Sequence, residues 1–312
     1  MDVRTSFLHH ELAETVFMDI PEGLHTDVSK DENGLRIVWR LIKSVYGLKQ
    51  SPRAWYGKIN KFFVDHRFHR SEYDHSVYIH LTFNLILLLY VDDIVITSPR
   101  MEDITWIQCS LQKAFEMTHL GPLTNFLGME LKRDRQTNIL LLLSQFNYIQ
   151  TILERQVMAS CMTVSTPADP HVRLVKTPPE QQTDICNRQC YQAAVGSLMY
   201  AMIGTWPDIA YAVSTVSQHS SNPGQSHWTA LRRIFCYLIG TPPLGLTYGS
   251  GLCPGYTDTD WGTGEDRKSI SGYVFLVNRA AVSWASKKQA SVALSSSEAE
   301  YIALPQGVKK SL

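Results

Sequence analysis

Two adjacent carboxylates, Asp92 and Asp93, stand between two apolar runs of the sequence. Residues 85–90 read Leu-Ile-Leu-Leu-Leu-Tyr, and residues 94–97 read Ile-Val-Ile-Thr. Two short β-prone runs around a polar break predict a hairpin with both acids at its bend. Neighbouring carboxylates repel each other, and a hard cation such as Mg²⁺ relieves the repulsion when substrate phosphates complete its oxygen shell. The alternative is an ordinary solvated turn, since Asp is common in turns.

A second group of acids lies near the C-terminal end. Asp258 and Asp260 belong to a Tyr-Thr-Asp-Thr-Asp run, and two further strands are expected at 270–277 and 281–285. Ser295 stands three residues before Glu298, the spacing of a capping box at a helix start. From the residues alone, Glu298 is a capping residue and Glu300 lies on a solvated helix face.

The chain has 312 residues, which is enough for two or more domains. Lys+Arg and Asp+Glu are both 29, so overall charge does not favour a generic polyanion binder. The distribution is uneven, because residues 36–70 carry nine basic side chains and one acid, Asp65. With interleaved aromatic residues, this segment indicates nucleic-acid binding. A solvated basic helix face is the alternative.

The composition also bears on the compartment. The six cysteines show no zinc-binding spacing, and free thiols in a reducing compartment are the default expectation. The N-terminus lacks a signal-peptide pattern. The longest apolar runs, 85–91 and 139–143, are shorter than the ~20 residues that span a bilayer. We therefore expect an intracellular protein, cytoplasmic or nuclear, that is neither secreted nor membrane-bound.

Periodicity and turn residues predict the remaining elements. Ser51-Pro52 starts a helix whose apolar stripe includes Trp55, with proline in the first turn. Further helices are expected at 102–117 and 145–160, over 191–220 as a pair with a break near Pro207, and at 227–239. The segment 163–185, rich in proline and polar residues, indicates a linker or surface segment. We expect the apolar residues at helical spacing in the 102–117 helix to belong to the core.

Two motifs in the right order carry a resemblance to a known family. Tyr90-Val91-Asp92-Asp93 resembles the YVDD box of reverse transcriptases. The stretch 46–52, Tyr-Gly-Leu-Lys-Gln-Ser-Pro, followed by Trp55-Tyr56, is similar to the YGLKQSP..WY signature of copia-type retrotransposon polymerases. Residues 2–8 resemble the family's DVKTAFL strand, and 125–131 its FLGIEI hairpin. The resemblance runs from Asp2 almost to the C-terminus, which identifies a copia-type (Pseudoviridae-like) LTR retrotransposon Pol polyprotein.

This resemblance implies an α+β fold, a polymerase palm of antiparallel sheet with helices, then a helical connection and a truncated ribonuclease H-like α/β domain. The expected domains are a palm without fingers at 1–100, a thumb-like region at 101–165, a connection at 166–250 and the ribonuclease H-like domain at 251–312. The implied activity is RNA-directed DNA synthesis. The implied partners are an RNA template, a DNA primer, an RNA–DNA hybrid, deoxynucleoside triphosphates and other Pol segments.

The resemblance also assigns roles in the polymerase site. Asp2 and Asp92 would hold two Mg²⁺ ions, with Mn²⁺ as a substitute, about 3.5–4 Å apart, and Asp93 would support them. The substrate-binding residues would be Phe7, which selects against a 2′-hydroxyl, together with a set that shapes the nucleotide and template pocket: Gly47, Gln50 and Tyr90.

For the second module, the family pattern YTDADWAGD…ALSSTEAEYIAL matches residues 256–304 and makes Asp258 and Glu300 the catalytic metal ligands. Asp260 and Glu298 would be their neighbours. The fold's remaining carboxylates come from a later strand, and Pro305 is expected to end or kink the helix near Leu304 at a cost of roughly 3 kcal/mol. We therefore expect hybrid cleavage to be absent or badly reduced in this chain alone.

Two other functions remain open at this point. An inactive retroelement relic or nucleic-acid-binding fragment fits the absent fingers, the absent last strand and Pro305. An unrelated metal phosphohydrolase would require the motif order to be coincidental. The start at Met1, directly before the first catalytic Asp, leads us to expect either a fragment of a longer Pol or a product that begins inside the palm.

Overall fold

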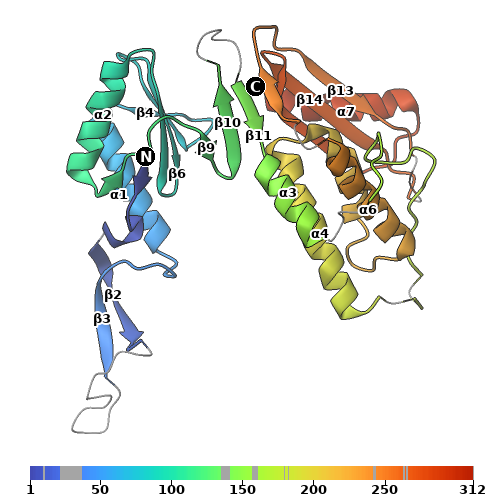
Figure 1. The fold of residues 1–312 in the computed structure, drawn as a ribbon, viewed down its shortest axis with the longest axis horizontal. Coiled ribbons are helices and arrows are strands. Elements are labelled where there is room, and N and C mark those ends of the chain that lie inside the picture. The colour runs from blue at the N-terminus through green and yellow to red at the C-terminus, as the bar shows by residue number, and fades with distance from the viewer. Residues whose placement is uncertain are drawn as a thin grey trace. The chain divides into compact units, whose positions relative to one another are not determined.

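The computed structural model describes residues 1–9, 11–21, 37–134, 141–156, 161–178, 180–181, 183–241, 244–262, 264 and 266–311. The chain forms two compact units, Met1–Leu123 and Thr124–Leu312 (Figure 1). Both units mix helices with antiparallel sheets, so the fold is α+β. The boundaries between the four predicted domains stay predictions.

The first unit is built on one antiparallel sheet of six strands in the order β4-β5-β6-β7-β1-β8. Its elements are β1 Asp2–Val3, η1 Ser6–His9, β2 Glu11–Asp19, β3 Val38–Lys43, α1 Ser51–Asp65, β4 His69–Arg70, β5 Val77–His80, β6 Leu85–Tyr90, β7 Asp93–Thr97, α2 Met101–Ala114 and β8 Met117–Thr118. Strand β1, which has two residues and lies between β7 and the edge strand β8, comes from the start of the chain.

The central hairpin of this sheet is β6–β7, as the sequence predicts. Tyr90 pairs with Asp93, which leaves Val91 and Asp92 as the tip. Burial alternates along β6: the side chains of Leu85, Leu87 and Leu89 are buried, and those between them are exposed. One face of the sheet therefore belongs to the core and the other is open.

Helices α1 and α2 supply the other half of this core. Trp55, Ile59 and Phe63 recur on one side of α1, while Ile107 and Leu111 do so on α2, and all are buried with the β6 leucines. Figure 1 shows both helices on the same side of the sheet. The predicted stripes are confirmed as core.

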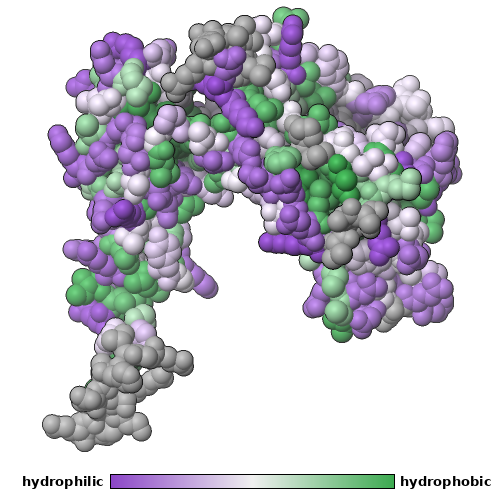
Figure 2. All heavy atoms as spheres, viewed as in Figure 1, coloured by the Kyte–Doolittle hydropathy of each residue, from purple (hydrophilic) through white to green (hydrophobic). Residues whose placement is uncertain are grey.

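A separate two-stranded ribbon, β2–β3, extends from the first unit (Figure 1). Its pairing runs from Asp19 opposite Val38 to Glu11 opposite Lys43, with a register shift between Glu11 and Val16. Phe17 and Ile42 are 62% and 74% exposed, and Figure 2 shows hydrophobic surface over this ribbon. Two strands alone do not make a core.

The second unit combines a helical bundle with two sheets. Its elements are β9 Asn125–Phe126, β10 Met129–Arg133, β11 Leu141–Ser144, α3 Phe146–Arg155, α4 Ile185–Gly204, η2 Pro207–Ile209, α5 Ala210–Ser217, α6 Gln225–Gly240, β12 Leu246–Tyr248, β13 Gly255–Thr259, β14 Ile270–Val277, β15 Ala280–Lys288 and α7 Ser296–Ser311. The predicted break near Pro207 is confirmed, and the FLGIEI-like stretch is the β9–β10 hairpin.

One core joins α3, α4, α5 and α6, with Tyr191, Leu198, Trp206 and Phe235 among its buried side chains. The sheets have the orders β12-β11-β10-β9 and β13-β14-β15. In the latter, α7 lies on β13 and β14, with Ala299 and Ala303 buried. The small residues let this helix approach the sheet closely.

Several expectations about local structure were wrong. Helix α3 ends at Arg155 rather than 160, with Gln156 as its C-cap, and α4 begins at Ile185 rather than 191, because Asp184 caps it there. Helix α2 ends at Ala114 rather than 117, because Met117–Thr118 pairs with β1. Helix α7 does not end near Leu304 but continues past Pro305 to Ser311, where Gly307 still packs against Thr257 of the sheet; the alternative, a kink at Pro305, stays a prediction. Not all thiols are free: Cys161 and Cys236, 75 residues apart, form a disulfide, a pairing that no local spacing could reveal.

Candidate active site

The first strand brings Asp2 to the acidic hairpin. Strand β1 lies between β7 and β8, where Asp2 is opposite Asp93 on one side and opposite Thr118 on the other. The Val3 amide donates to the Asp92 carbonyl at 2.9 Å. The structure thus assembles Asp2, Asp92 and Asp93 from segments 90 residues apart in the sequence.

The carboxylates lie on the open face of the sheet. Val3 and Ile94 are buried, so strand alternation directs their neighbours Asp2 and Asp93 to the opposite face. Tyr90, the cross-strand partner of Asp93, shares that face and is 53% exposed. A substrate approaching from solvent would meet both acids and this tyrosine.

The Asp92 carboxylate is oriented by two hydroxyl groups. Ser6 Oγ donates to Oδ1 at 2.5 Å, and Tyr46 Oη donates to Oδ2 at 3.3 Å. The Phe7 ring lies beside Tyr46, with ring centroids 4.6 Å apart. Ser6 is fully buried, so its hydroxyl is a fixed donor. Sequence reasoning missed Ser6, although it stands where the family motif has alanine.

The three acids influence one another electrostatically. Burial, reinforced by the charges of Asp2 and Asp92, raises the pKa of the Asp93 carboxyl above its ordinary value. The protonated form is favoured because negative charge is crowded there. A bound cation would oppose that effect.

Asp93→Asn is expected to raise the midpoint of thermal unfolding at pH 7 in the presence of EDTA. Because the folded-state pKa is raised, the native state binds the proton more tightly than the unfolded chain. Stability is therefore lost as pH rises through the folded pKa, and the variant escapes that loss. The gain should vanish below about pH 3.9, where the unfolded carboxyl is also protonated.

Calorimetry from pH 3.5 to 7.5 measures this difference. Asp65→Asn, at an exposed acid at the end of α1, is the matched control. A gain that is absent at neutral pH, or that grows on acidification, would contradict the expected repulsion.

The donor set suits a hard cation. Within the described ranges, no three His, Cys, Asp or Glu side chains form a group that could hold a metal ion. Mg²⁺, however, is usually held by one or two carboxylates, with substrate phosphates and waters completing the shell. Asp2 and Asp93, opposite each other in the ladder, are two carboxylates on adjacent strands.

Tyr46 and Gln50 flank the glycine that the sequence singles out. Gly47 has φ of +95°, a left-handed conformation that favours glycine. Gln50 is the N-cap residue of α1. Gly47 and Gln50 belong to the turn between Tyr46, whose hydroxyl bonds Asp92, and the start of α1.

A hollow of about 890 Å³ lies between β2 and α1. Arg53, Lys58 and Lys61 line it from α1, and Glu11 and Glu14 line it from β2. Lys58 Nζ donates to the His9 carbonyl at 2.5 Å. The side chains of Arg53, Lys58 and Lys61 are all exposed to solvent.

The acids of the second unit are arranged differently. Thr259 accepts a hydrogen bond from Gln289, which also bonds the first turn of α7, so alternation along β13 turns Asp258 to the other side of the sheet. Asp258 and Glu300 are both exposed. Their pairing as metal ligands stays a prediction.

The neighbouring acids have structural partners. Asp260 Oδ1 accepts the Ile270 amide. Glu298 accepts the Leu294 amide at 2.7 Å, while its own amide donates to Ser295 Oγ at 3.1 Å. This confirms the predicted cap at the start of α7.

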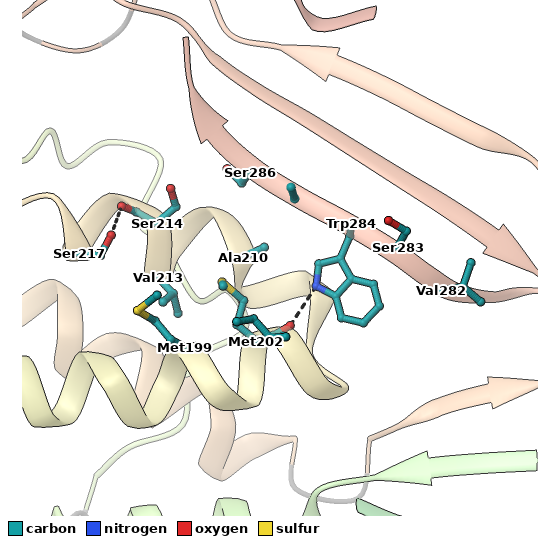
Figure 3. A pocket seen from close by; sticks show the side chains of 12 residues that line it. Met199, Met202, Ala210, Val213, Ser214, Ser217, Val282, Ser283, Trp284 and Ser286 are labelled. Atoms are coloured by element: carbon teal, nitrogen blue, oxygen red, sulfur yellow. Dashed lines mark hydrogen bonds between the residues drawn. The ribbon is translucent and has the colours of Figure 1, made fainter. Parts of the chain in front are cut away.

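A second hollow, of about 480 Å³, lies among α4, α5 and β15 (Figure 3). Trp284 Nε1 donates to the Met202 carbonyl at 2.9 Å beside it. Its lining is methionine, isoleucine, alanine, valine, serine and the Trp284 ring, without titratable groups among the residues named. No chemistry follows from it.

In the described part of the chain, no helix is long and apolar enough to cross a bilayer.

The profile of the family described as reverse transcriptase (RNA-dependent DNA polymerase) matches residues 1–170. The retrovirus-related Pol polyprotein from transposon TNT 1-94 of Nicotiana tabacum is 42% identical over 320 residues, which cover 99% of this chain and 24% of that protein. The corresponding protein from transposon RE2 of Arabidopsis thaliana is 36% identical over 96% of this chain and 20% of its own length.

A putative transposon Ty5-1 protein of Saccharomyces cerevisiae is 31% identical over 315 residues, which cover 99% of both chains. The chain spans a quarter or less of the length of the tobacco and Arabidopsis relatives. The similarity to the tobacco and yeast relatives covers nearly all of this chain and therefore includes both units.

Proposed function

Because the chain belongs to the reverse transcriptase family of copia-type retrotransposon Pol polyproteins, we propose that it is an RNA-directed DNA polymerase with Asp2, Asp92 and Asp93 as its catalytic carboxylates. The supporting observation is the register of β1, which sets Asp2 opposite Asp93 beside the Asp92 turn. Acids that are far apart in the chain thereby share one open face.

Each residue of this site has a distinct part in the proposal. Asp2 and Asp92 are the proposed ligands of two cations, and Asp93, opposite Asp2 on the adjacent strand, supports them. Hydrogen bonds from Ser6 and Tyr46 hold the Asp92 carboxylate in place. A bound Mg²⁺ or Mn²⁺ would supply Lewis-acid activation of the primer 3′-hydroxyl and charge neutralisation for the leaving pyrophosphate. The open face leaves room for the template–primer duplex.

Substrate selection is assigned to the aromatic pair and the turn after it. Phe7, packed beside Tyr46, would lie under the sugar and exclude a 2′-hydroxyl. Gly47 and Gln50 would shape the nucleotide and template pocket, and Tyr90 would line the open face. Arg53, Lys58 and Lys61 would neutralise phosphates of the bound nucleic acid.

The test is primer extension by the full chain on poly(rA)/oligo(dT) with Mg²⁺, compared with Asp92→Asn and with EDTA. Synthesis that requires Asp92 and the metal supports the proposal. Binding to the same template–primer without Asp92-dependent synthesis would instead favour the inactive relic or nucleic-acid-binding fragment.

Phe7→Val is expected to raise the efficiency of ribonucleotide incorporation relative to deoxynucleotide incorporation by about 10- to 100-fold. The smaller side chain removes the surface that would meet a 2′-hydroxyl, while deoxynucleotides lose little. Single-nucleotide kcat/KM for dTTP and UTP measures the ratio. Phe17→Val, at an exposed phenylalanine on β2, is the control. An unchanged ratio would remove Phe7 from this role.

For the second unit we propose, more narrowly, that Asp258 takes part in metal-dependent hydrolysis of RNA in an RNA–DNA hybrid, with Glu300 as its predicted partner. The motif around Tyr256 supports this. Hybrid cleavage by the full chain is expected to be weak, and Asp258→Asn should abolish what remains. Glu300→Gln and Glu298→Gln, assayed side by side, distinguish the predicted ligand from the cap. Cleavage unaffected by Asp258→Asn would end the proposal.

A further inference from the structure

The tip of the β6–β7 hairpin adopts a backbone conformation that its residue disfavours. Val91 has φ of +53°, in the left-handed region. A β-branched residue meets steric hindrance there, and such conformations persist only when the surrounding structure enforces them. Since the Val91 side chain is 51% exposed, its own packing does not supply the enforcement. Other contacts to the tip must do so.

One of these contacts comes from helix α1. Trp55 Nε1 donates a hydrogen bond to the Val91 carbonyl at 2.9 Å, across 36 residues of sequence. On the other side of the tip, the Val3 amide donates to the Asp92 carbonyl. The two peptide units of the tip are therefore held by separate donors, one from a side chain and one from β1.

The indole is itself held rigidly. Trp55 is 2% exposed, and its ring meets Phe115 edge-on, with centroids 5.4 Å apart and an interplanar angle of 80°. The His9 ring lies on another side at 6.0 Å. A buried indole N–H requires an acceptor, and the acceptor here is the carbonyl directly before Asp92.

We propose that Trp55 is a positioning residue for the carboxylate turn. By holding the Val91 carbonyl it keeps Val91 in the left-handed conformation, and this conformation directs the Asp92 carboxylate to Ser6 and Tyr46. Trp55 touches neither substrate nor metal in this role, which rests on the proposed polymerase function only for its effect on catalysis.

The experiment is a double-mutant cycle in the full chain. Trp55→Phe keeps the aromatic bulk and removes the N–H donor. Val91→Gly removes the steric hindrance of the left-handed conformation, so that the turn no longer depends on that hydrogen bond. Hydrogen exchange of amides 90–95 reports how firmly the turn is held, and primer extension reports the consequence for catalysis. Trp106→Phe, on α2 and remote from the turn contacts, is the matched control.

Trp55→Phe is expected to speed exchange of the turn amides about 10-fold and to lower kcat for extension about 10-fold, the equivalent of one buried hydrogen bond. With Gly at position 91, both effects should shrink to about 3-fold or less. A residue that only fills the core would act equally in the two backgrounds. Equal effects, or none beyond that of Trp106→Phe, overturn the proposal.

The two proposals fail separately. If the unaltered chain shows no Asp92-dependent extension, the polymerase function is wrong, and the exchange cycle still decides whether Trp55 holds the turn. If extension is present and the exchange cycle shows no coupling between positions 55 and 91, the positioning role is wrong.

Discussion

Asp92→Asn is expected to lower kcat/KM for primer extension by about 10³-fold. Cation-assisted charge stabilisation contributes several kcal/mol to such reactions, and each 1.36 kcal/mol is a factor of ten. Asparagine has nearly the same size and keeps an oxygen that can accept the Ser6 hydrogen bond. The variant therefore removes the charge and spares the fold. Steady-state extension on poly(rA)/oligo(dT) gives the value.

Two controls separate this loss from damage to the protein. The thermal midpoint of Asp92→Asn should be no lower than that of the unaltered chain, and Asp65→Asn, at an exposed acid on the same unit, should extend primers normally. Retention of activity within tenfold would mean that the Asp92 charge is not required, and the carboxylate site would have to be abandoned.

Leu87→Ala is expected to destabilise the first unit by about 3 kcal/mol. Leu87 is fully buried in β6, the strand of the acidic hairpin, and a leucine-to-alanine change in a core leaves a cavity that costs about 2–5 kcal/mol. Urea dependence of amide exchange in the 85–97 hairpin, measured in the full chain, isolates this unit from the other.

Leu88→Ala is the matched control, the same substitution one residue along the strand. Leu88 is 37% exposed on the open face, so its loss should cost about 1 kcal/mol or less. Equal costs at the two positions would mean that the strand does not divide into a buried and an open side, and the placement of Asp93 on the open face would lose its basis.

This pair of leucines shows where sequence reasoning stops. The run from Leu85 to Leu89 predicts a β-strand beside Asp92 and Asp93, and the hairpin is there. Because every residue of the run is apolar, no alternation marks which side is covered. Only the packing of α1 and α2 decides that Leu87 is inside and Leu88 outside.

The site was partly predictable for a similar reason. Asp2 was assigned through its motif, while its position opposite Asp93 depends on a three-strand register that local sequence does not encode. Ser6 could have been found as a departure from the family's alanine. The Trp55 bond to Val91 could not, since a buried indole needs an acceptor but the sequence does not say which.

The four-stranded sheet has a consequence for any shortened form of the chain. Strand β12, at Leu246–Tyr248, pairs with β11, about a hundred residues earlier. The helices between them therefore form one long insertion whose two ends meet in the β11–β12 pairing. The family profile stops at residue 170, inside this insertion. A piece trimmed to the profile would keep β11 and lose its neighbour, leaving an unprotected edge on which copies can stack. Boundaries drawn from homology would thus yield an aggregation-prone fragment, whereas a cut after Leu123 would leave all four sheets of the described residues whole.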